Sequence, residues 1–133
     1  MTPFTEELVK LARAARRRAH APYSRFYVGA AVRTSDGRTF SGANVENASY
    51  GLSICAERAS VVAAVNASSP GIVELAVALG GSPPVAPCGA CRQTLTEFAG
   101  DLPITVVNER DERLETTLAE LLPRAFRPDD LPR

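Results

Sequence analysis

The sequence predicts an α/β fold, a three-layer α/β/α sandwich built around one mixed five-stranded sheet. The chain opens with an amphipathic helical pattern and a hairpin signal, and helical segments then alternate with short apolar strands. Its 133 residues, 45% of them hydrophobic and 23% charged, have the size and composition of one globular domain. We therefore expect a single domain over residues 1–133, with a core that is stable without disulfides.

The first expected element is a helix over residues 3–20, because apolar side chains recur there at spacings of three and four. Thr2 is the expected N-cap, and Ala21-Pro22 ends the helix. Arginines fill the other face between residues 13 and 18. Since the chain has zero net charge, we interpret them as a solvated face and not as an RNA-binding strip.

The remaining elements follow from turn signals and apolar runs. Strands over residues 27–34 and 38–45 form a hairpin, because Asp-Gly between apolar runs favours a tight turn. The later elements are helices over residues 55–67 and 88–99 and strands over residues 72–79, 104–107 and 114–116. Thr-Leu-Ala-Glu at residues 117–120 is a capping box that begins a short last helix.

Charge and hydropathy exclude several kinds of partner. Fifteen basic and fifteen acidic residues leave no surplus positive charge for nucleic acid. Apolar runs such as residues 75–79 are far shorter than the roughly 18 residues that a membrane span needs. Glu6 and Glu7 stand where a signal peptide would have a basic start. These features predict a cytoplasmic protein that neither binds nucleic acid nor crosses a membrane.

Three cysteines, Cys55, Cys88 and Cys91, carry the strongest chemical signal. An odd number in a chain without a secretion signal indicates reduced thiols. All three lie at predicted helix starts, where the helix dipole lowers the pKa of a thiol. Because both helix starts are expected beyond the carboxyl edge of the sheet, the three thiolates can converge.

Two kinds of chemistry suit these thiols. The Cys-x-x-Cys pair alone fits a thioredoxin-like redox site equally well, but redox chemistry requires neither a third cysteine nor Glu57. A closed structural zinc site needs a fourth ligand, and we interpret His20, the other soft candidate, as an ordinary side chain. Three ligands leave one position for water, as in catalytic zinc sites, with Glu57 as proton carrier. Spacing alone does not bring Glu57 to that water, because residues two apart on a helix point to nearly opposite faces.

A set of motifs extends along nearly the whole chain. Cys-Ala-Glu at residues 55–57 is followed by Pro-Cys-Gly-Ala-Cys-Arg-Gln at residues 87–93. Further motifs lie at residues 21–26, 28–31, 44–50 and 121–126. In these motifs the chain resembles the small, homotetrameric class of zinc-dependent cytidine deaminases. Polynucleotide deaminases usually have histidine where Cys55 stands, so the resemblance points to free nucleosides.

The resemblance implies a hydrolase of pyrimidine salvage that converts cytidine and deoxycytidine to uridine and deoxyuridine with release of ammonia. It implies one zinc ion per chain, held by the three cysteines, with a zinc-bound hydroxide attacking C4 while Glu57 carries the protons. One alternative is deamination of a nucleoside antibiotic such as blasticidin S, against which Asn-Val-Glu-Asn at residues 44–47 argues. Another is a zinc or thiol-redox module without this activity.

The substrate contacts are also implied by the resemblance. Asn44 and Glu46 would bind the ribose, Phe26 would stack on the pyrimidine, and Tyr50 and the backbone of Ala56 would border the base. Taken alone, the first two suggest an ordinary polar loop and Phe26 a core side chain.

Two arginines follow candidate site residues directly. Zinc with three thiolates carries a net charge of minus one, so guanidinium donors on the sulfurs would offset charge and orient the ligands. The resemblance supports this role for Arg58, whereas Arg92 either acts similarly or is an ordinary surface side chain.

Phe126 lies in an irregular, proline-bounded tail, where a large apolar side chain needs a partner. The resemblance implies a homotetramer in which Phe126 reaches the base site of a neighbouring subunit, so that active sites are shared. The alternative is that Phe126 folds back onto its own core.

Overall fold

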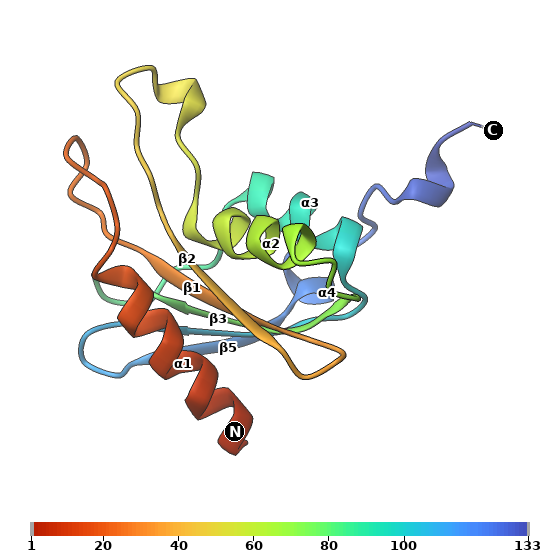
Figure 1. Ribbon diagram of the computed structural model, residues 1–133, viewed down its shortest axis with the longest axis horizontal. Helices are drawn as coiled ribbons and strands as arrows, with labels where there is room; N and C mark the ends of the chain where they lie inside the picture. The colour runs from red at the N-terminus through yellow and green to blue at the C-terminus, as the bar shows by residue number, and fades with distance from the viewer. Residues whose placement is uncertain (1, 133) are drawn as a thin grey trace.

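Five strands form one mixed sheet in the computed structural model, which describes residues 2–132 (Figure 1). They are β1 (Gly29–Thr34), β2 (Thr39–Ala43), β3 (Ile72–Ala78), β4 (Pro103–Val107) and β5 (Arg113–Thr117). Their order is β2-β1-β3-β4-β5, with β3 and β4 parallel and the other neighbours antiparallel. The predicted mixed five-stranded sheet is confirmed.

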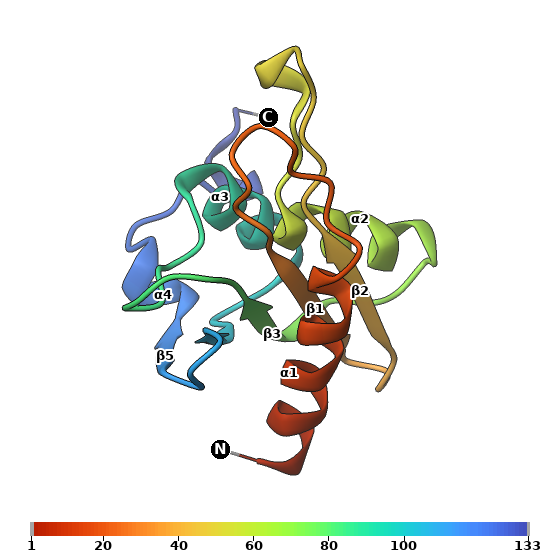
Figure 2. The same cartoon turned by 90° about the vertical axis from the view of Figure 1, so that its left-hand side faces the viewer.

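Helices cover both faces of this sheet. Helix α1 (Pro3–Arg16) lies on one face, while α2 (Ala56–Asn66) and α3 (Gly89–Phe98) lie on the other (Figures 1 and 2). The three-layer α/β/α sandwich is therefore confirmed. Within residues 2–132, no helix has both the length and the apolar character that a membrane crossing requires.

Alternate residues of the central strands supply two separate apolar clusters. In β3, Leu75 and Val77 pack beneath α2 and α3, whereas Ala76 and Ala78 face α1. This period of two is the expected consequence of strand geometry. Because the side chains facing α1 are mostly alanine, that helix lies close to the sheet.

Two glycines permit the close approach of helix to strand. A Cβ on Gly29 would come within 2.1 Å of the carbonyl oxygen of Ala12 in α1. A Cβ on Gly42 would come within 2.7 Å of the Cβ of Ala59 in α2. The distance of α2 from the sheet therefore depends on the missing side chain at Gly42.

Helix α1 ends at Arg16, four residues before the predicted end. The amides of residues 17–19 bond to carbonyls three residues earlier, which is a tightened last turn. His20 then donates from its amide to the carbonyl of Asn44 and accepts from the amide of Glu46. Pairing with a distant segment thus replaces the last predicted helical turn.

The hairpin strands are also shorter than predicted. Beyond the ladder, the side-chain oxygen of Asn44 accepts from the amide of Val28 at 2.9 Å. A side chain thus takes the place of a strand partner, and β1 begins only at Gly29. The remaining short elements are α4 (Leu118–Leu121) and the 3-10 turns η1 (Tyr50–Leu52) and η2 (Pro128–Asp130).

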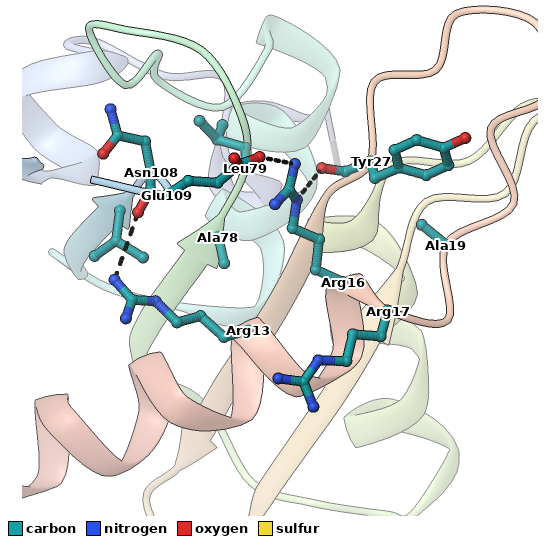
Figure 3. A pocket seen from close by; sticks show the side chains of 10 residues that line it. Arg13, Arg16, Arg17, Ala19, Tyr27, Ala78, Leu79, Asn108 and Glu109 are labelled. Carbon is teal, nitrogen blue, oxygen red and sulfur yellow. Dashed lines mark hydrogen bonds and ion pairs between the residues drawn. The ribbon is translucent and has the colours of Figure 1, made fainter. Parts of the chain in front are cut away.

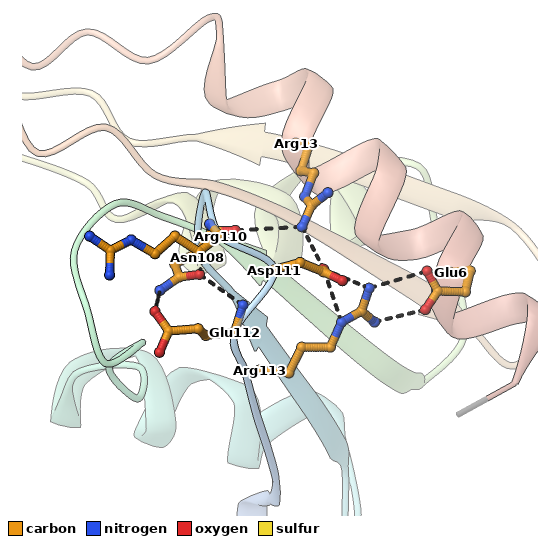
Figure 4. Close-up of polar contacts among 7 residues, drawn as sticks. All are labelled: Glu6, Arg13, Asn108, Arg110, Asp111, Glu112 and Arg113. Carbon is orange, nitrogen blue, oxygen red and sulfur yellow. Dashed lines mark hydrogen bonds and ion pairs between the residues drawn. The ribbon is translucent and has the colours of Figure 1, made fainter.

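Arginines of α1 tie the helix to the turn between β4 and β5. Arg16 donates to the carboxylate of Glu109 at 2.9 Å and to the carbonyl of Tyr27 at 2.8 Å (Figure 3). Arg13 donates to the carboxylate of Asp111 at 2.8 Å (Figure 4). The predicted solvated face of this helix therefore also makes ion pairs within the chain.

The same turn holds the loop that leads into α3. Asn108, which is buried, donates from Nδ2 to the carbonyl of Gly81 and to the carboxylate of Glu112, both at 2.9 Å. Ser82 donates to the same carboxylate at 2.8 Å, and Figure 4 shows the Asn108–Glu112 contact. These bonds fix the loop before Cys88.

Candidate active site

The three cysteine sulfurs converge at the starts of two helices. Cys55 is the N-cap of α2, Cys88 is the N-cap of α3, and Cys91 lies in the first turn of α3. All three sulfurs lie within 4.8 Å of one another, with 3.9 Å from Cys55 to Cys88 and 3.5 Å from Cys88 to Cys91. Tetrahedral zinc with bonds of about 2.3 Å separates its sulfur ligands by roughly 3.8 Å. The sulfur positions therefore fit zinc, and the predicted convergence is confirmed.

The protonation of these thiols also suits a cation. The pKa of Cys55 is lowered to about 5, first by a hydrogen bond from Cys91 and then by the nearby Arg58. The pKa of Cys91 is raised, because it donates that bond and is buried. Deprotonated sulfurs this close together repel one another, and a divalent cation between them would satisfy all three thiolates.

Arg58 lies against this cluster, as expected. Its Nη2 is 3.8 Å from the sulfur of Cys55 and 3.4 Å from the carbonyl oxygen of Ser53. A guanidinium at this position offsets negative charge on the sulfurs. Arg92 differs from Arg58: its hydrogen bonds go to the carbonyls of Pro87 and Leu121 and not to a cysteine sulfur, so the expected direct contact with the thiolates is not seen for Arg92.

Glu57 lies in the first turn of α2 and is only 6% exposed. Burial raises the pKa of its carboxyl to about 7, with a smaller rise from the charge of Cys55. Cys55 has extended backbone angles and stands just outside the regular helix. For this reason Cys55 and Glu57 can both face the same cavity, although they are only two residues apart.

A cavity of about 500 Å³ adjoins the cysteines. Its lining includes the predicted site residues Phe26, Asn44, Glu46, Tyr50, Cys55, Ala56, Glu57, Arg58 and Cys88. It also includes residues that the sequence analysis missed, namely Val28, Ser53, Ile54, Leu79, Val85 and Ala86. Four of these residues directly precede the Cys55 or Pro87-Cys88 motifs, and this position next to a metal ligand could have identified them as lining residues. The other two belong to or adjoin apolar strands and resemble core residues in sequence.

The two candidate ribose ligands already hold the segment before β1. Asn44 accepts from the amide of Val28 and donates from Nδ2 to the carbonyl of Phe26 at 2.8 Å. Glu46 accepts from the hydroxyl and amide of Ser24 and from the amide of Tyr23, and these bonds lower its pKa. An amide has two hydrogens and two lone pairs, so Asn44 keeps one of each for a ligand.

Aromatic side chains surround the cavity mouth. Phe26 is 43% exposed, and Tyr50, which packs edge-on against Tyr23, is 74% exposed. Phe126 is 56% exposed and is not part of the cavity lining. The alternative in which Phe126 folds back onto its own core is therefore wrong.

A three-thiol metal site beside a buried carboxylate, on an α/β/α sandwich, defines the class of zinc-dependent deaminases. Comparison with protein families narrows this class. The family described as "Cytidine and deoxycytidylate deaminase zinc-binding region" matches residues 3–106. The chain belongs to this family, and Cys55, Cys88 and Cys91 are its zinc ligands.

Individual relatives match over nearly their full length. Cytidine deaminase of Sporosarcina psychrophila is 42% identical over 127 residues, covering 95% of this chain and 93% of the relative. Cytidine deaminase of Halalkalibacterium halodurans is 45% identical over 125 residues, covering 93% and 95%. The crystal structure of cytidine deaminase from Burkholderia pseudomallei has a TM-score of 0.88 and 46% identity, covering 95% of this chain and 100% of that one.

Proposed function

We propose that the protein deaminates cytidine and deoxycytidine hydrolytically, giving uridine and deoxyuridine with release of ammonia. The observation that carries the proposal is the buried carboxyl of Glu57, which lines a nucleoside-sized cavity beside three converged thiols. The relatives described above, named cytidine deaminases, support the choice of substrate. The reaction consumes one water and replaces the exocyclic amine at C4 with oxygen.

The zinc ligands prepare the nucleophile. When bound, zinc lowers the pKa of a water molecule and so supplies a nucleophile near neutral pH. Cys55, Cys88 and Cys91 would hold the metal at the cavity wall, and three protein ligands would leave a place for water. Arg58 offsets the negative charge of the sulfurs through its contact with Cys55.

Glu57 moves the protons in this proposal. Its carboxylate accepts a proton from the water whose oxygen forms the new bond to C4, and delivers that proton to N3 of the ring. It then accepts the remaining proton from the oxygen now bonded to C4 and delivers it to the exocyclic nitrogen, so that the bond from C4 to that nitrogen breaks, the C4 carbonyl forms and ammonia leaves. Because Glu57 is buried, bulk water competes little for these protons.

The cavity rim holds the nucleoside. Phe26 stacks on the pyrimidine, and Tyr50 and the backbone of Ala56 border the base. The remaining donor of Asn44 and the carboxylate of Glu46 bind the ribose hydroxyls. Asn44 and Glu46 also form hydrogen bonds to residues 23–28 and so fix the loop that carries Phe26. The same two residues therefore position both the ribose contacts and the aromatic ring that stacks on the base.

The active species is a homotetramer with shared sites. Its support is the exposure of Phe26, Tyr50 and Phe126, large apolar side chains that one chain leaves open to solvent. Phe126 cannot close the cavity of its own chain, whose lining it does not join. It closes the cavity of a neighbour instead.

The test is ammonia release from cytidine, deoxycytidine and blasticidin S by purified protein whose zinc content is measured by elemental analysis. We expect one zinc per chain and ammonia from both pyrimidine nucleosides. Ammonia from blasticidin S alone would assign the antibiotic as substrate. No ammonia from any substrate, with reversible formation of a Cys88–Cys91 disulfide, would identify a thiol-redox module.

A further inference from the structure

The guanidinium of Arg92 connects two segments that are far apart in sequence. Its Nε donates to the carbonyl of Pro87 at 2.7 Å, and its Nη1 donates to the carbonyl of Leu121 at 2.9 Å. The next side chain, Gln93, donates from Nε2 to the carbonyl of Phe126 at 2.8 Å. Helix α3 therefore contacts both the loop before the metal ligands and the C-terminal segment.

The carbonyl of Pro87 belongs to the peptide that leads into Cys88. Pro87 is buried, and Cys88 caps the helix that also carries Cys91. Because a peptide unit is planar, a hydrogen bond that fixes the carbonyl direction also fixes the plane from which Cys88 continues. A rotation of that plane would move the sulfur of Cys88 away from the sulfur of Cys55, now 3.9 Å distant.

The carbonyl of Leu121 lies at the other end of the connection. Leu121 is the last residue of α4, where carbonyls have no partner within the helix, and Arg92 supplies the donor. The side chain of Leu121 packs against the apolar cluster beneath α2 and α3. From this anchored point the chain continues to Phe126, whose own carbonyl is held by Gln93.

We propose that Arg92 is a positioning residue that holds Cys88 in place for zinc and, together with Gln93, holds the segment that carries Phe126. Both acceptors of Arg92 are neutral carbonyls, so its effect depends on the planar, forked guanidinium more than on charge. A lysine keeps the charge but donates from one nitrogen and cannot reproduce this fork. The part of the inference that concerns Phe126 rests on the proposed function.

The experiment compares Arg92→Lys, Arg92→Ala and Gln93→Ala, with Arg17→Lys at the exposed C-cap of α1 as the matched control. Zinc affinity is measured by competition with a chromophoric chelator, and KM and kcat are measured with cytidine. We expect both Arg92 variants to bind zinc about 10- to 100-fold more weakly, as for other residues that orient metal ligands, and to show a raised KM. Gln93→Ala should raise KM and leave zinc affinity unchanged.

The outcomes separate the inference from the proposed function. Unchanged zinc affinity in Arg92→Lys and Arg92→Ala would overturn the role at Cys88, as would an equal loss in Arg17→Lys. An unchanged KM in Gln93→Ala would overturn the role at Phe126. If Arg92→Ala loses its cooperative unfolding transition, Arg92→Lys decides. Chelator competition needs no substrate, so a zinc-binding protein inactive on cytidine would disprove the proposed function and leave the test of Cys88 valid.

Discussion

At the scale of single residues, the site depends on the buried carboxyl of Glu57, which forms no ion pair with any residue between 2 and 132. Arg58, whose positive charge acts on Glu57, donates to the sulfur of Cys55 and not to the carboxyl of Glu57. The carboxyl of Glu57 therefore lies in weakly polar surroundings that disfavour its charged form. This burial accounts for the rise of its pKa to about 7. The same position lets its oxygens reach a ligand in the cavity.

We predict that Glu57→Gln keeps zinc and the fold but loses most of its turnover. The amide is nearly the same size as the carboxyl but cannot accept and return a proton. A positioned general acid and base contributes roughly 10²- to 10⁴-fold, and this one acts more than once in the cycle. The measurement is kcat with cytidine beside zinc content, and the control is Glu97→Gln, an exposed acid on α3. Turnover close to that of the parent would refute the assignment.

A second prediction concerns Arg58→Ala. Removing the guanidinium takes away the donor to the Cys55 sulfur and the positive charge that offsets three thiolates. We expect zinc retention or kcat to fall about 10- to 100-fold, because residues that orient metal ligands have effects of that size. Dialysis against a chelator and steady-state kinetics measure the two effects. Arg110→Ala, at an exposed turn, is the control, and equal behaviour of the two variants would contradict the charge argument.

At the scale of elements, the position of α2 determines where Cys55 and Glu57 lie, and Gly42 of β2 limits how closely α2 packs. We predict that Gly42→Ala destabilises the protein by about 1 to 3 kcal/mol, the usual cost of overpacking. The added Cβ would meet Ala59 at 2.7 Å and push the helix outward. Urea unfolding measures the change. Gly100→Ala adds a Cβ with open space around it and should have little effect; an equal cost in both variants would disprove the packing explanation.

Elements whose signals are local could be predicted from the sequence. The Asp-Gly turn and the Thr2 cap needed only neighbouring residues. The end of α1 could not be predicted, because it depends on bonds between His20 and residues 44–46 that have no local signal. The metal ligands were recognisable because cysteine is rare and its spacing is specific. The hydrogen-bond partners of Arg92 could not be predicted, because they are backbone carbonyls, which every residue possesses.

At the scale of the whole molecule, both apolar clusters share one sheet, with Ala31 on one face of β1 and Val32 on the other. We propose that residues 1–133 fold as one domain, because loss of α1 would expose strands that also support α2 and α3. We predict a single unfolding transition, with circular dichroism and tyrosine fluorescence changing together in urea. Two separated transitions would contradict it.

The assembly gives a further prediction. Light scattering should report four chains, because Phe126 lies exposed outside its own cavity lining and burial against a neighbouring copy would remove it from water. Phe126→Ala should clearly raise KM for cytidine but change the unfolding midpoint of the chain only slightly, because the side chain is 56% exposed within its own chain. Phe4→Ala, another exposed phenylalanine but on α1, is the control. A fully active monomer would overturn the shared site.

The convergence of thiols also makes a removable cross-link. Cys55 and Cys88 are 33 positions apart, and the chain between them forms α2 and β3. An ion held by both sulfurs closes this stretch into a ring, and in the chain-entropy description a ring of that size restricts the unfolded chain by about 4 kcal/mol. Unlike a disulfide, the link opens when the metal leaves, so the strength of the closure follows the concentration of free zinc. The zinc ion that takes part in catalysis therefore also stabilises the folded segment between Cys55 and Cys88, which includes the central strand β3.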